Sequence, residues 1–338
     1  MKNQVSQRLL QWYHQNKRDL PWRQTKDPYK ILVSEIMLQQ TRVETVIPYF
    51  LRFINAFPNI QTLANVEDDV LMKYWQGLGY YRRASNLKKA MQQCVEYYDG
   101  SMPLNKAELL KLTGIGDYTA GAVASIAFNE QCSAIDGNVC RVYSRLYHIE
   151  DDITKLATKR YIDELIQREY NDQMGDFNQA LMDLGSQICI SKGIPKCEIC
   201  PLKDICEAKQ KNIQMTLPYK PKAKPKKIQQ YSVIIYKHQN QVLVTKRPSD
   251  GLLASLYEFY IVDEFVKDKL VDYTYLDKYK HIFTHMIWEM EGFLIEVDEK
   301  IERPNFQWVE ISKLDTTYCI PTAYQPFLKR LKENIAYE

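Results

Sequence analysis

Residues 112–122 read Leu-Thr-Gly-Ile-Gly-Asp-Tyr-Thr-Ala-Gly-Ala, and this stretch bears most directly on the fold. Its two glycines, Gly114 and Gly116, permit positive φ angles and allow a ligand to approach the backbone closely. The small residues that follow, as far as Ala127, predict a helix that packs tightly and presents unpaired N–H groups to a phosphate. Alone, such a turn is equally compatible with a plain connection between two helices.

A cluster of cysteines follows further along the chain, with a Cys-x2-Cys core and two prolines beside it: Cys189, Cys197, Cys200 and Cys206. Such a density of thiols predicts a metal site. Four thiolates suit either zinc or a [4Fe–4S] cluster, and the spacing does not distinguish the two. The N-terminus has no signal-peptide core, so we expect a cytoplasmic location, where cysteines stay reduced.

The length of 338 residues favours two domains. Apolar residues at three-to-four spacing predict an all-α region over residues 1–212. Residues 213–229 are rich in proline and lysine and predict an extended linker. Residues 230–338 predict a smaller α+β domain, in which β-branched and aromatic residues indicate strands at 231–236, 241–246, 256–262, 281–297 and 306–309 before a helix at 322–335.

The net charge of +3, from 45 basic and 42 acidic residues, does not by itself indicate DNA binding, although it can hide a basic face. No apolar run reaches the roughly 18 residues that a membrane-spanning helix needs. We therefore expect no association with a membrane.

The glycine hairpin and the cysteine cluster together resemble the helix-hairpin-helix glycosylases of the endonuclease III and MutY families. The resemblance implies a structural [4Fe–4S] cluster on the four cysteines and a monomer that binds double-stranded DNA containing an adenine mispair. The family usually has one residue fewer between its first two cysteines. We interpret the additional residue between Cys189 and Cys197 as an insertion in a loop. A catalytic aspartate follows the hairpin by about twenty residues in this superfamily, and Asp136 lies at that place in Ile-Asp-Gly-Asn-Val.

A second carboxylate, Glu35, lies in an otherwise apolar helix at 31–38. Burial there would raise its pKa and equip it as an acid, although most helix glutamates reach solvent. Residues 34–41, Ser-Glu-Ile-Met-Leu-Gln-Gln-Thr, resemble the adenine glycosylase motif, in which the glutamate protonates N7 of adenine. Asp136 would stabilise the cationic sugar or trap it covalently, and Asn138 would orient these groups.

Tyr118 stands where bifunctional relatives of this family carry a lysine that forms a Schiff base. Because an imine needs an amine, we expect a monofunctional enzyme that leaves an abasic site. The tyrosine would support the two carboxylates through its hydroxyl, and it is equally compatible with simple packing against the hairpin.

The resemblance also implies residues that read the mispair. Those around the adenine would be Trp22, Arg23, Leu38 and Gln179. Those that contact DNA around the flipped nucleotide would be Gln40, Thr41, Leu78 and Tyr80, with Gly114 and Gly116 of the hairpin. Trp22 could equally be a core residue, Gln179 a cap of a backbone group, and Tyr80 the start of an amphipathic helix.

Residues 246–259 resemble the MutT-like (Nudix) C-terminal domain of the same family. The Arg-Glu-x2-Glu-Glu cluster that would hold a divalent metal does not follow Glu258, so this domain is expected to recognise DNA and not to hydrolyse a nucleotide. Phe283, Thr284 and His285 match the segment that contacts 8-oxoguanine, although His285 could also be an ordinary strand histidine.

These features predict a monofunctional glycosylase that removes adenine opposite 8-oxoguanine or guanine in base excision repair. Two alternatives stay open at this point. One is an endonuclease III-like glycosylase for oxidised pyrimidines, and the other is a non-catalytic iron–sulfur protein that binds DNA.

Overall fold

The computed structural model describes residues 4–222, 224–263 and 272–336. It separates into two compact units, Met1–Asn65 with Asn86–Lys222, and Val66–Ser85 with Ala223–Glu338. The first residues of the expected helical region, Ala223 of the expected linker, and residues 264–271 and 337–338 lie outside the described residues. No helix among the described residues is long and apolar enough to cross a bilayer.

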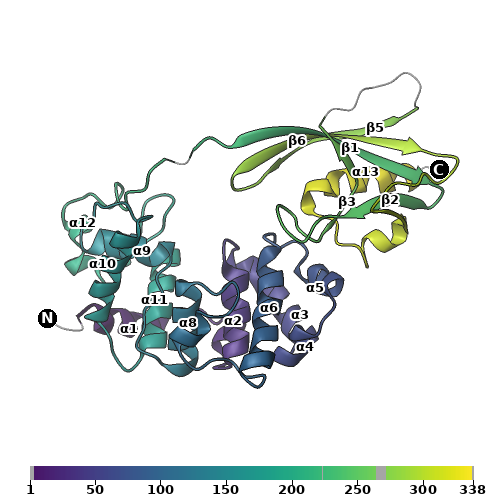
Figure 1. Ribbon diagram of the computed structural model, residues 1–338. Coiled ribbons are helices and arrows are strands. Elements are labelled where there is room, and N and C mark those ends of the chain that lie inside the picture. The colour runs from purple at the N-terminus through teal and green to yellow at the C-terminus, as the bar shows by residue number, and fades with distance from the viewer. Residues whose placement is uncertain (1–3, 223, 264–271, 337–338) are drawn as a thin grey trace. The chain divides into compact units, whose positions relative to one another are not determined.

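The first unit is helical, as the sequence predicts (Figure 1). Its α-helices are α1 (Gln4–Asn16), α2 (Pro28–Leu38), α3 (Val43–Ala56), α4 (Ile60–Ala64), α7 (Lys106–Leu109), α8 (Asp117–Phe128), α9 (Gly137–Leu146), α10 (Leu156–Gln167), α11 (Met174–Gln187) and α12 (Glu207–Gln210), together with most of α6 (Arg82–Tyr97). Three short 3-10 helices complete it: η1 (Pro21–Arg23), η2 (Cys197–Ile199) and η3 (Lys203–Ile205).

Two apolar helices form the centre of this unit. Helix α2 starts at the N-cap Asp27, whose side chain accepts from the backbone N–H of Tyr29, and buries every residue from Ile31 to Met37. Helix α8 packs against α2 and α11. A Cβ at its Gly121 would lie 2.0 Å from the carbonyl oxygen of Ser133, so only glycine allows this approach. The close contact fixes the segment that leads to Asp136.

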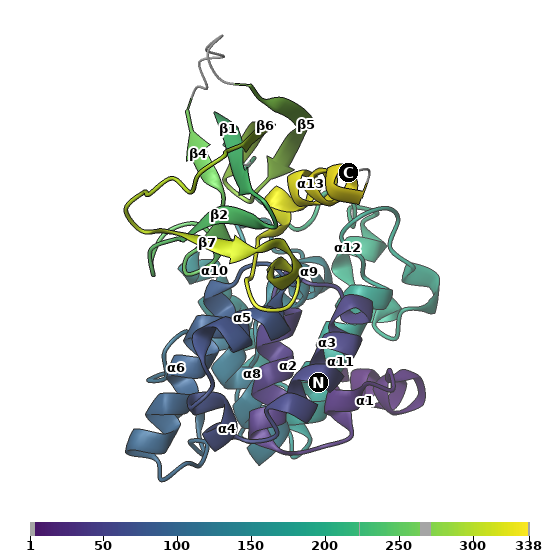
Figure 2. The ribbon, with the colours of Figure 1, turned by 90° about the vertical axis from the view of Figure 1, so that its right-hand side faces the viewer.

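The second unit contains a mixed sheet in the order β3-β2-β1-β6-β5, with β4 paired to β1 and β7 to β2 (Figure 2). Its strands are β1 (Lys227–His238), β2 (Gln241–Lys246), β3 (Tyr257–Glu258), β4 (Tyr260–Val262), β5 (Thr274–Ile282), β6 (Met286–Glu296) and β7 (Phe306–Glu310). Its helices are α5 (Asp68–Trp75), η4 (Ile311–Leu314), η5 (Thr322–Tyr324) and α13 (Gln325–Ala336). The apolar face of α13 packs on the sheet, where Phe327 and Leu331 are fully buried with Val233 and Met290.

One expected strand is wrong in its extent. Residues 281–297 do not form a single run, because β5 ends at Ile282 and β6 begins at Met286. The backbone N–H of Phe283 donates to the carbonyl of Met286 at 2.9 Å and closes a tight turn. That turn contains neither glycine nor proline, so the sequence carried no signal for it.

Residues 66–85 belong with the second unit, although they lie within the region that the sequence assigns to the helical domain. Lys73 of α5 donates to the carbonyls of Leu314 at 3.3 Å and Tyr318 at 3.2 Å, and Tyr257 donates to Asp69 at 3.0 Å. Contacts between segments so far apart in the chain leave no periodic pattern, so they could not be predicted from the sequence.

Candidate active site

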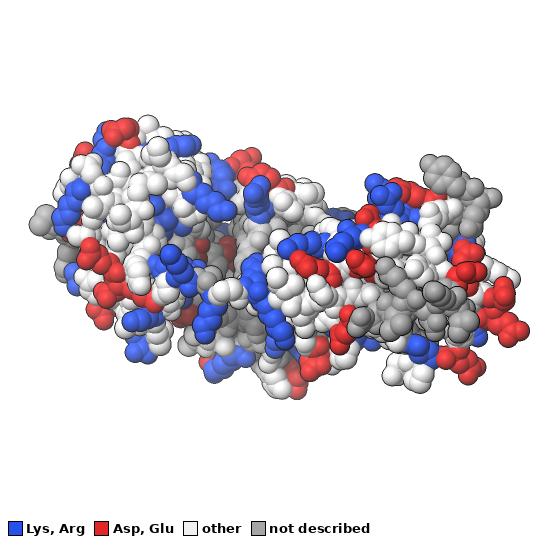
Figure 3. Space-filling model, turned by 90° about the horizontal axis from the view of Figure 1, so that it is seen from above, with Lys and Arg blue, Asp and Glu red and all other residues white. Residues whose placement is uncertain are grey.

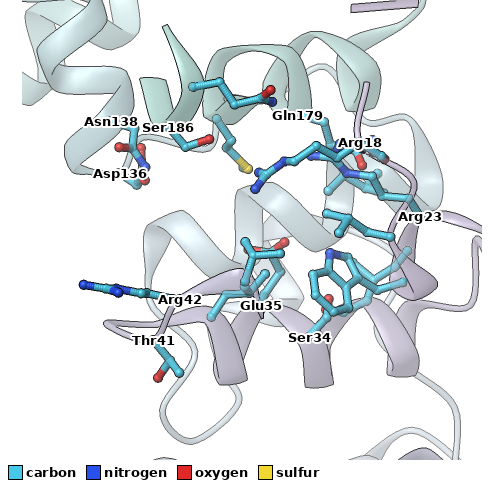
Figure 4. Close-up of a pocket in the computed structure, with 18 of the residues that line it drawn as sticks. Arg18, Arg23, Ser34, Glu35, Thr41, Arg42, Asp136, Asn138, Gln179 and Ser186 are labelled. Carbon is cyan, nitrogen blue, oxygen red and sulfur yellow. Dashed lines mark hydrogen bonds between the residues drawn. The ribbon is translucent and has the colours of Figure 1, made fainter. Parts of the chain in front are cut away.

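The helical unit contains a cavity of about 620 Å³, a size suited to a small organic group (Figure 4). Its walls come from α2, η1, α8, α11 and the segment before α9. The cavity brings together all four expected catalytic residues, Glu35, Tyr118, Asp136 and Asn138. The four residues expected around adenine, Trp22, Arg23, Leu38 and Gln179, line the same cavity.

Glu35 points from α2 into this cavity and is only 5% exposed. The hydroxyl of Tyr118 donates to Oε2 of Glu35 at 2.6 Å. Burial raises the pKa of Glu35 to about 6, and the nearby charge of Asp136 adds to the rise, while the Tyr118 hydrogen bond and the Arg23 guanidinium oppose it. Near neutral pH, Glu35 is therefore protonated to a far greater extent than an ordinary glutamate, which suits a general acid.

Asp136 lies on a different wall, as the N-cap of α9 (Figure 4). Its Oδ1 accepts from the backbone N–H of Val139 at 2.8 Å, and its Oδ2 accepts from Nδ2 of Asn138 at 2.7 Å. Burial raises the pKa of Asp136, whereas these hydrogen bonds favour its ionised form. The Asn138 amide is held in turn by Nη2 of Arg141 at 2.8 Å. The two carboxyl groups thus face one cavity from two sides.

Tyr118 is fixed by its two neighbours, the carboxyl of Glu35 and Sδ of Met182, which lies 3.6 Å from the hydroxyl. Burial and the two carboxylates hold its pKa well above the ordinary value, so the hydroxyl stays protonated and can donate. Among the described residues that line the cavity there is no lysine. The cavity wall therefore offers no lysine amine for a Schiff base.

The residues expected around adenine also make structural contacts. Trp22 packs edge-on against Phe50, with the ring centroids 5.4 Å apart. The amide Nε2 of Gln179 donates to the carbonyl of Gly175 at 3.2 Å within its own helix. Each of these two side chains is therefore held by a structural contact and also lines the cavity.

Comparison with known proteins agrees with this geometry. Residues 33–168 match the model of the HhH-GPD superfamily of base excision DNA repair proteins, and residues 231–330 match that of the NUDIX domain. An adenine DNA glycosylase of Buchnera aphidicola subsp. Baizongia pistaciae is 36% identical over 97% of this chain and 96% of its own length. The chain belongs to the adenine DNA glycosylase family.

Two further relatives are similar to parts of this glycosylase. The adenine DNA glycosylase of Mus musculus is 42% identical over 60% of this chain and 41% of its own length. The solved structure of a thermostable thymine-DNA glycosylase superposes with a TM-score of 0.56 and is 30% identical, covering 61% of this chain and 95% of its own. The helical fold is thus shared with glycosylases that act on different bases.

Four of the residues expected to contact DNA lie in the helical unit of the glycosylase. Thr41 lines the cavity, and Gln40 has a positive φ of 57°. In the hairpin, Gly114 has a φ of 78°, as expected of glycine. Gly116 differs from expectation, because its φ of −95° is an ordinary extended value and the residue is the N-cap of α8. A Cβ at Gly116 would meet no atom within 4 Å, so its backbone is open to a ligand.

The remaining expected DNA contacts of the glycosylase lie in the second unit. Leu78 is 6% exposed, whereas Tyr80 is 47% exposed and has a φ of 47°. The Tyr80 hydroxyl lies 2.6 Å from Oγ1 of Thr284. Phe283 packs edge-on between His281 and Trp288, at centroid distances of 4.5 and 4.9 Å, and His285 is exposed. The turn at 283–285 therefore presents two polar side chains on an aromatic base.

The four clustered cysteines of the glycosylase line a second, small cavity of about 30 Å³. All are free thiols, and burial raises the pKa of Cys200 to about 12. Nη1 of Arg145 donates to Sγ of Cys189 at 3.2 Å. Thiols gathered around one cavity beside a cation fit a group that binds thiolates. Within the described ranges, no three or more cysteine, histidine or acidic side chains are already arranged to hold a metal ion.

Glu258, at the end of the MutT-like stretch, is engaged by protein groups. Arg247 forms an ion pair with its carboxylate, and the hydroxyl of Tyr324 donates to the same oxygen at 2.8 Å. The carboxylate is almost fully buried. The only glutamate of that stretch is therefore already paired with protein groups.

Charged side chains on the face seen in Figure 3 are mixed, with Lys and Arg interspersed among Asp and Glu over both units. This agrees with the small net charge. One local detail matters for the hairpin: Nζ of Lys106 lies 3.0 Å from Oδ1 of Asp117, in the first turn of α8. The pairing offsets a carboxylate that would otherwise repel a phosphate at that helix end.

The sequence analysis missed two residues beside the acid, Arg18 and Asp183. Arg18 lines the cavity, and both of its bonding nitrogens contact the fully buried carboxylate of Asp183. The two residues are 165 positions apart, so no spacing rule could have connected them.

Proposed function

We propose that this glycosylase hydrolyses the N-glycosidic bond of adenine mispaired with 8-oxoguanine or guanine, and that it is monofunctional. The observation that carries the proposal is the placement of Glu35 and Asp136 on two walls of one cavity. One carboxyl is buried, with its pKa raised to about 6, and the other accepts two hydrogen bonds that favour its charge. That pairing suits a reaction in which a base leaves as a cation develops on the sugar.

In this mechanism the adenine is flipped out of the duplex into the cavity, because the scissile bond cannot be reached within the stack. Glu35 donates its proton to N7 of the base, which turns adenine into a better leaving group. Tyr118 keeps the acid oriented, because its hydroxyl donates a hydrogen bond to Oε2 of Glu35. As the C1′–N9 bond breaks, Asp136 stabilises the oxocarbenium-like sugar, either electrostatically or through a covalent bond that water then hydrolyses.

Asn138 assists by holding Asp136 in place, since its amide donates to the carboxylate while Arg141 holds the amide. Trp22, Arg23, Leu38 and Gln179 would enclose the base. With no lysine amine among the described cavity residues, no imine forms, and the product is an abasic site.

Recognition of the opposite strand is assigned to the second unit. Phe283, Thr284 and His285 would contact 8-oxoguanine, and Tyr80 with Leu78 would fill the vacated stack. On the helical unit, Gln40 and Thr41 would lie against the orphan base, and the backbone at Gly114 and Gly116 would bind phosphate. The segment 213–229 would link the two recognition regions in a protein that acts as a monomer.

Cys189, Cys197, Cys200 and Cys206 would hold a [4Fe–4S] cluster, whose contribution would be structural because it would tie together the loop at 189–206. The fit rests on four free thiols around one cavity and on the Arg145 guanidinium beside Cys189. That cation would offset the negative charge of the bound thiolates.

The proposed reaction predicts a strand break that appears only after alkali. A labelled duplex with one 8-oxoguanine–adenine pair is incubated with the protein and then analysed with and without hot alkali. Because an abasic site is stable until base treatment, we expect cleavage only in the alkali-treated sample. Efficient cleavage without alkali, or trapping of the protein on DNA by borohydride, would contradict a monofunctional mechanism. Release of thymine glycol with retention of adenine would favour the endonuclease III-like alternative.

The cluster proposal predicts that iron and inorganic sulfide copurify with the native protein in equal amounts, at about four of each per chain. Cys197→Ser should lose most of both, since a serine hydroxyl is a poor ligand for the cluster. Cys94→Ser, at a buried cysteine outside the cluster, is the matched control and should keep them. Zinc in place of iron and sulfide would overturn this assignment and leave the glycosylase reaction unaffected.

A further inference from the structure

We propose that Asp183 is a positioning residue, which holds Arg18 and Arg23 at the cavity wall and keeps their positive charge from acting unopposed on Glu35. The inference rests on the proposed function, in which Glu35 is the acid, and assigns a role to a residue that does not itself line the cavity.

The contacts of Asp183 are unusually complete. Its side chain, on α11, is fully buried. Oδ1 accepts from Nε of Arg18 at 2.9 Å, from Nη2 of Arg18 at 2.5 Å and from Nη2 of Arg23 at 2.9 Å. Oδ2 accepts from Nη1 of Arg23 at 2.6 Å. One carboxylate therefore binds two guanidiniums, and both of those guanidiniums line the cavity.

The second step concerns where these guanidiniums point. Figure 4 shows Arg18 and Arg23 on the cavity wall beside Glu35. Nη1 of Arg23 also donates to the carbonyl of Arg18 at 3.4 Å, and its guanidinium lies 5.6 Å from the ring centroid of Tyr13. These contacts leave Arg23 little freedom to move away, so the balance of charge at the wall depends on Asp183.

Charged and titratable groups reach the surroundings of Glu35 from every neighbouring element. They are Tyr118 from α8, Asp136 from the segment before α9, Arg23 from η1, Arg18 from the segment before it, Arg42 and Glu44 at the start of α3, and Asp183 from α11. The positive charge of Arg23 lowers the pKa of Glu35, and the negative charge of Asp136 raises it. With Asp183 present, the two arginines and one carboxylate sum to +1, and without it they sum to +2.

The extra positive charge should stabilise the ionised form of Glu35 and leave less of the acid at neutral pH. The native single-turnover rate of adenine release should fall as pH rises through about 6, where Glu35 loses its proton. In Asp183→Asn, which keeps the size of the side chain, the fall should move to lower pH by about 1 on the pH scale. The measurement is the rate on an 8-oxoguanine–adenine duplex across pH.

A charge-balanced double variant separates electrostatics from packing. Arg18→Met with Asp183→Asn removes one charge of each sign, so the midpoint of the pH profile should return toward the native value even if the rate does not. A purely structural role would leave the midpoint of both variants unchanged and would overturn the inference. Should Asp183→Asn fail to fold, the double variant is compared with Arg18→Met instead. Arg18→Met keeps the Asp183 carboxylate and lacks one positive charge, so the midpoint of its pH profile should lie above that of the double variant.

One control variant, together with the native protein, keeps the tests apart. Glu150→Gln removes an exposed carboxylate that lies against His148 and does not line the cavity, and its profile should match the native one. If the native protein releases no adenine at any pH, the proposed function fails. If it releases adenine and Asp183→Asn shows the native midpoint, the function stands and the role of Asp183 is refuted.

Discussion

Glu35→Gln should lower the single-turnover rate of adenine release by about 10²–10⁴-fold, the usual contribution of a general acid. Glutamine keeps the size of the side chain and an oxygen that can accept from the Tyr118 hydroxyl, so the cavity should hold its shape. What it loses is the dissociable proton. The rate is measured with enzyme in excess over an 8-oxoguanine–adenine duplex.

The pH profile of Glu35→Gln is a second test of the role of Glu35. The native rate depends on a group with a pKa of about 6, and that dependence should disappear when Glu35 is replaced. Glu164→Gln, at an exposed position of α10, serves as the control for the chemical change and should behave like the native protein. Unchanged duplex affinity would show that the substitution affects the chemical step. A native-like rate in Glu35→Gln would remove this glutamate from the reaction.

The residues proposed as catalytic could be singled out in the sequence because their signals are local. Glu35 interrupts a helix that is otherwise apolar, and such an exception within a periodic pattern is visible in the sequence. The residues around Asp136 alone indicate only a helix cap, and its position after the glycine hairpin is what predicted a catalytic role. In the structure it is both, since Asp136 caps α9 by accepting from the backbone N–H of Val139 and also lines the cavity.

Other features could not be predicted, because they depend on contacts between distant parts of the chain. The Arg18–Asp183 pair is one such case, and the grouping of residues 66–85 with the sheet is another. The prediction of one continuous strand across the turn at 283–285 was wrong for a different reason. Apolar and aromatic residues continue on both sides of it, and the turn is closed by a backbone hydrogen bond that any residues could make. The expectation for Gly116 failed because a helix N-cap adopts extended angles without needing glycine.

Asp136→Asn should lower the rate of adenine release by about 10²–10³-fold, because the sugar then develops positive charge with no carboxylate beside it. Asparagine caps a helix about as well as aspartate, so the fold should lose less than about 1 kcal/mol of its free energy of unfolding. Its amide oxygen can still accept from the backbone N–H of Val139, as Oδ1 does now. Loss of rate without loss of stability would therefore report the carboxylate, that is, its charge together with the hydrogen bond that it accepts from Asn138.

The chain offers a matched control for this substitution. Asp27 is the N-cap of α2 and accepts from the backbone N–H of Tyr29 at 2.9 Å, and it does not line the cavity. Asp27→Asn makes the same chemical change at the same kind of position, so its rate should stay near the native rate while its stability changes as little as that of Asp136→Asn. If the two variants lost rate equally, the effect of Asp136 would belong to helix capping. If only Asp136→Asn loses rate, the carboxylate acts on the sugar, because helix capping is common to both positions and, of the two, only Asp136 lines the cavity.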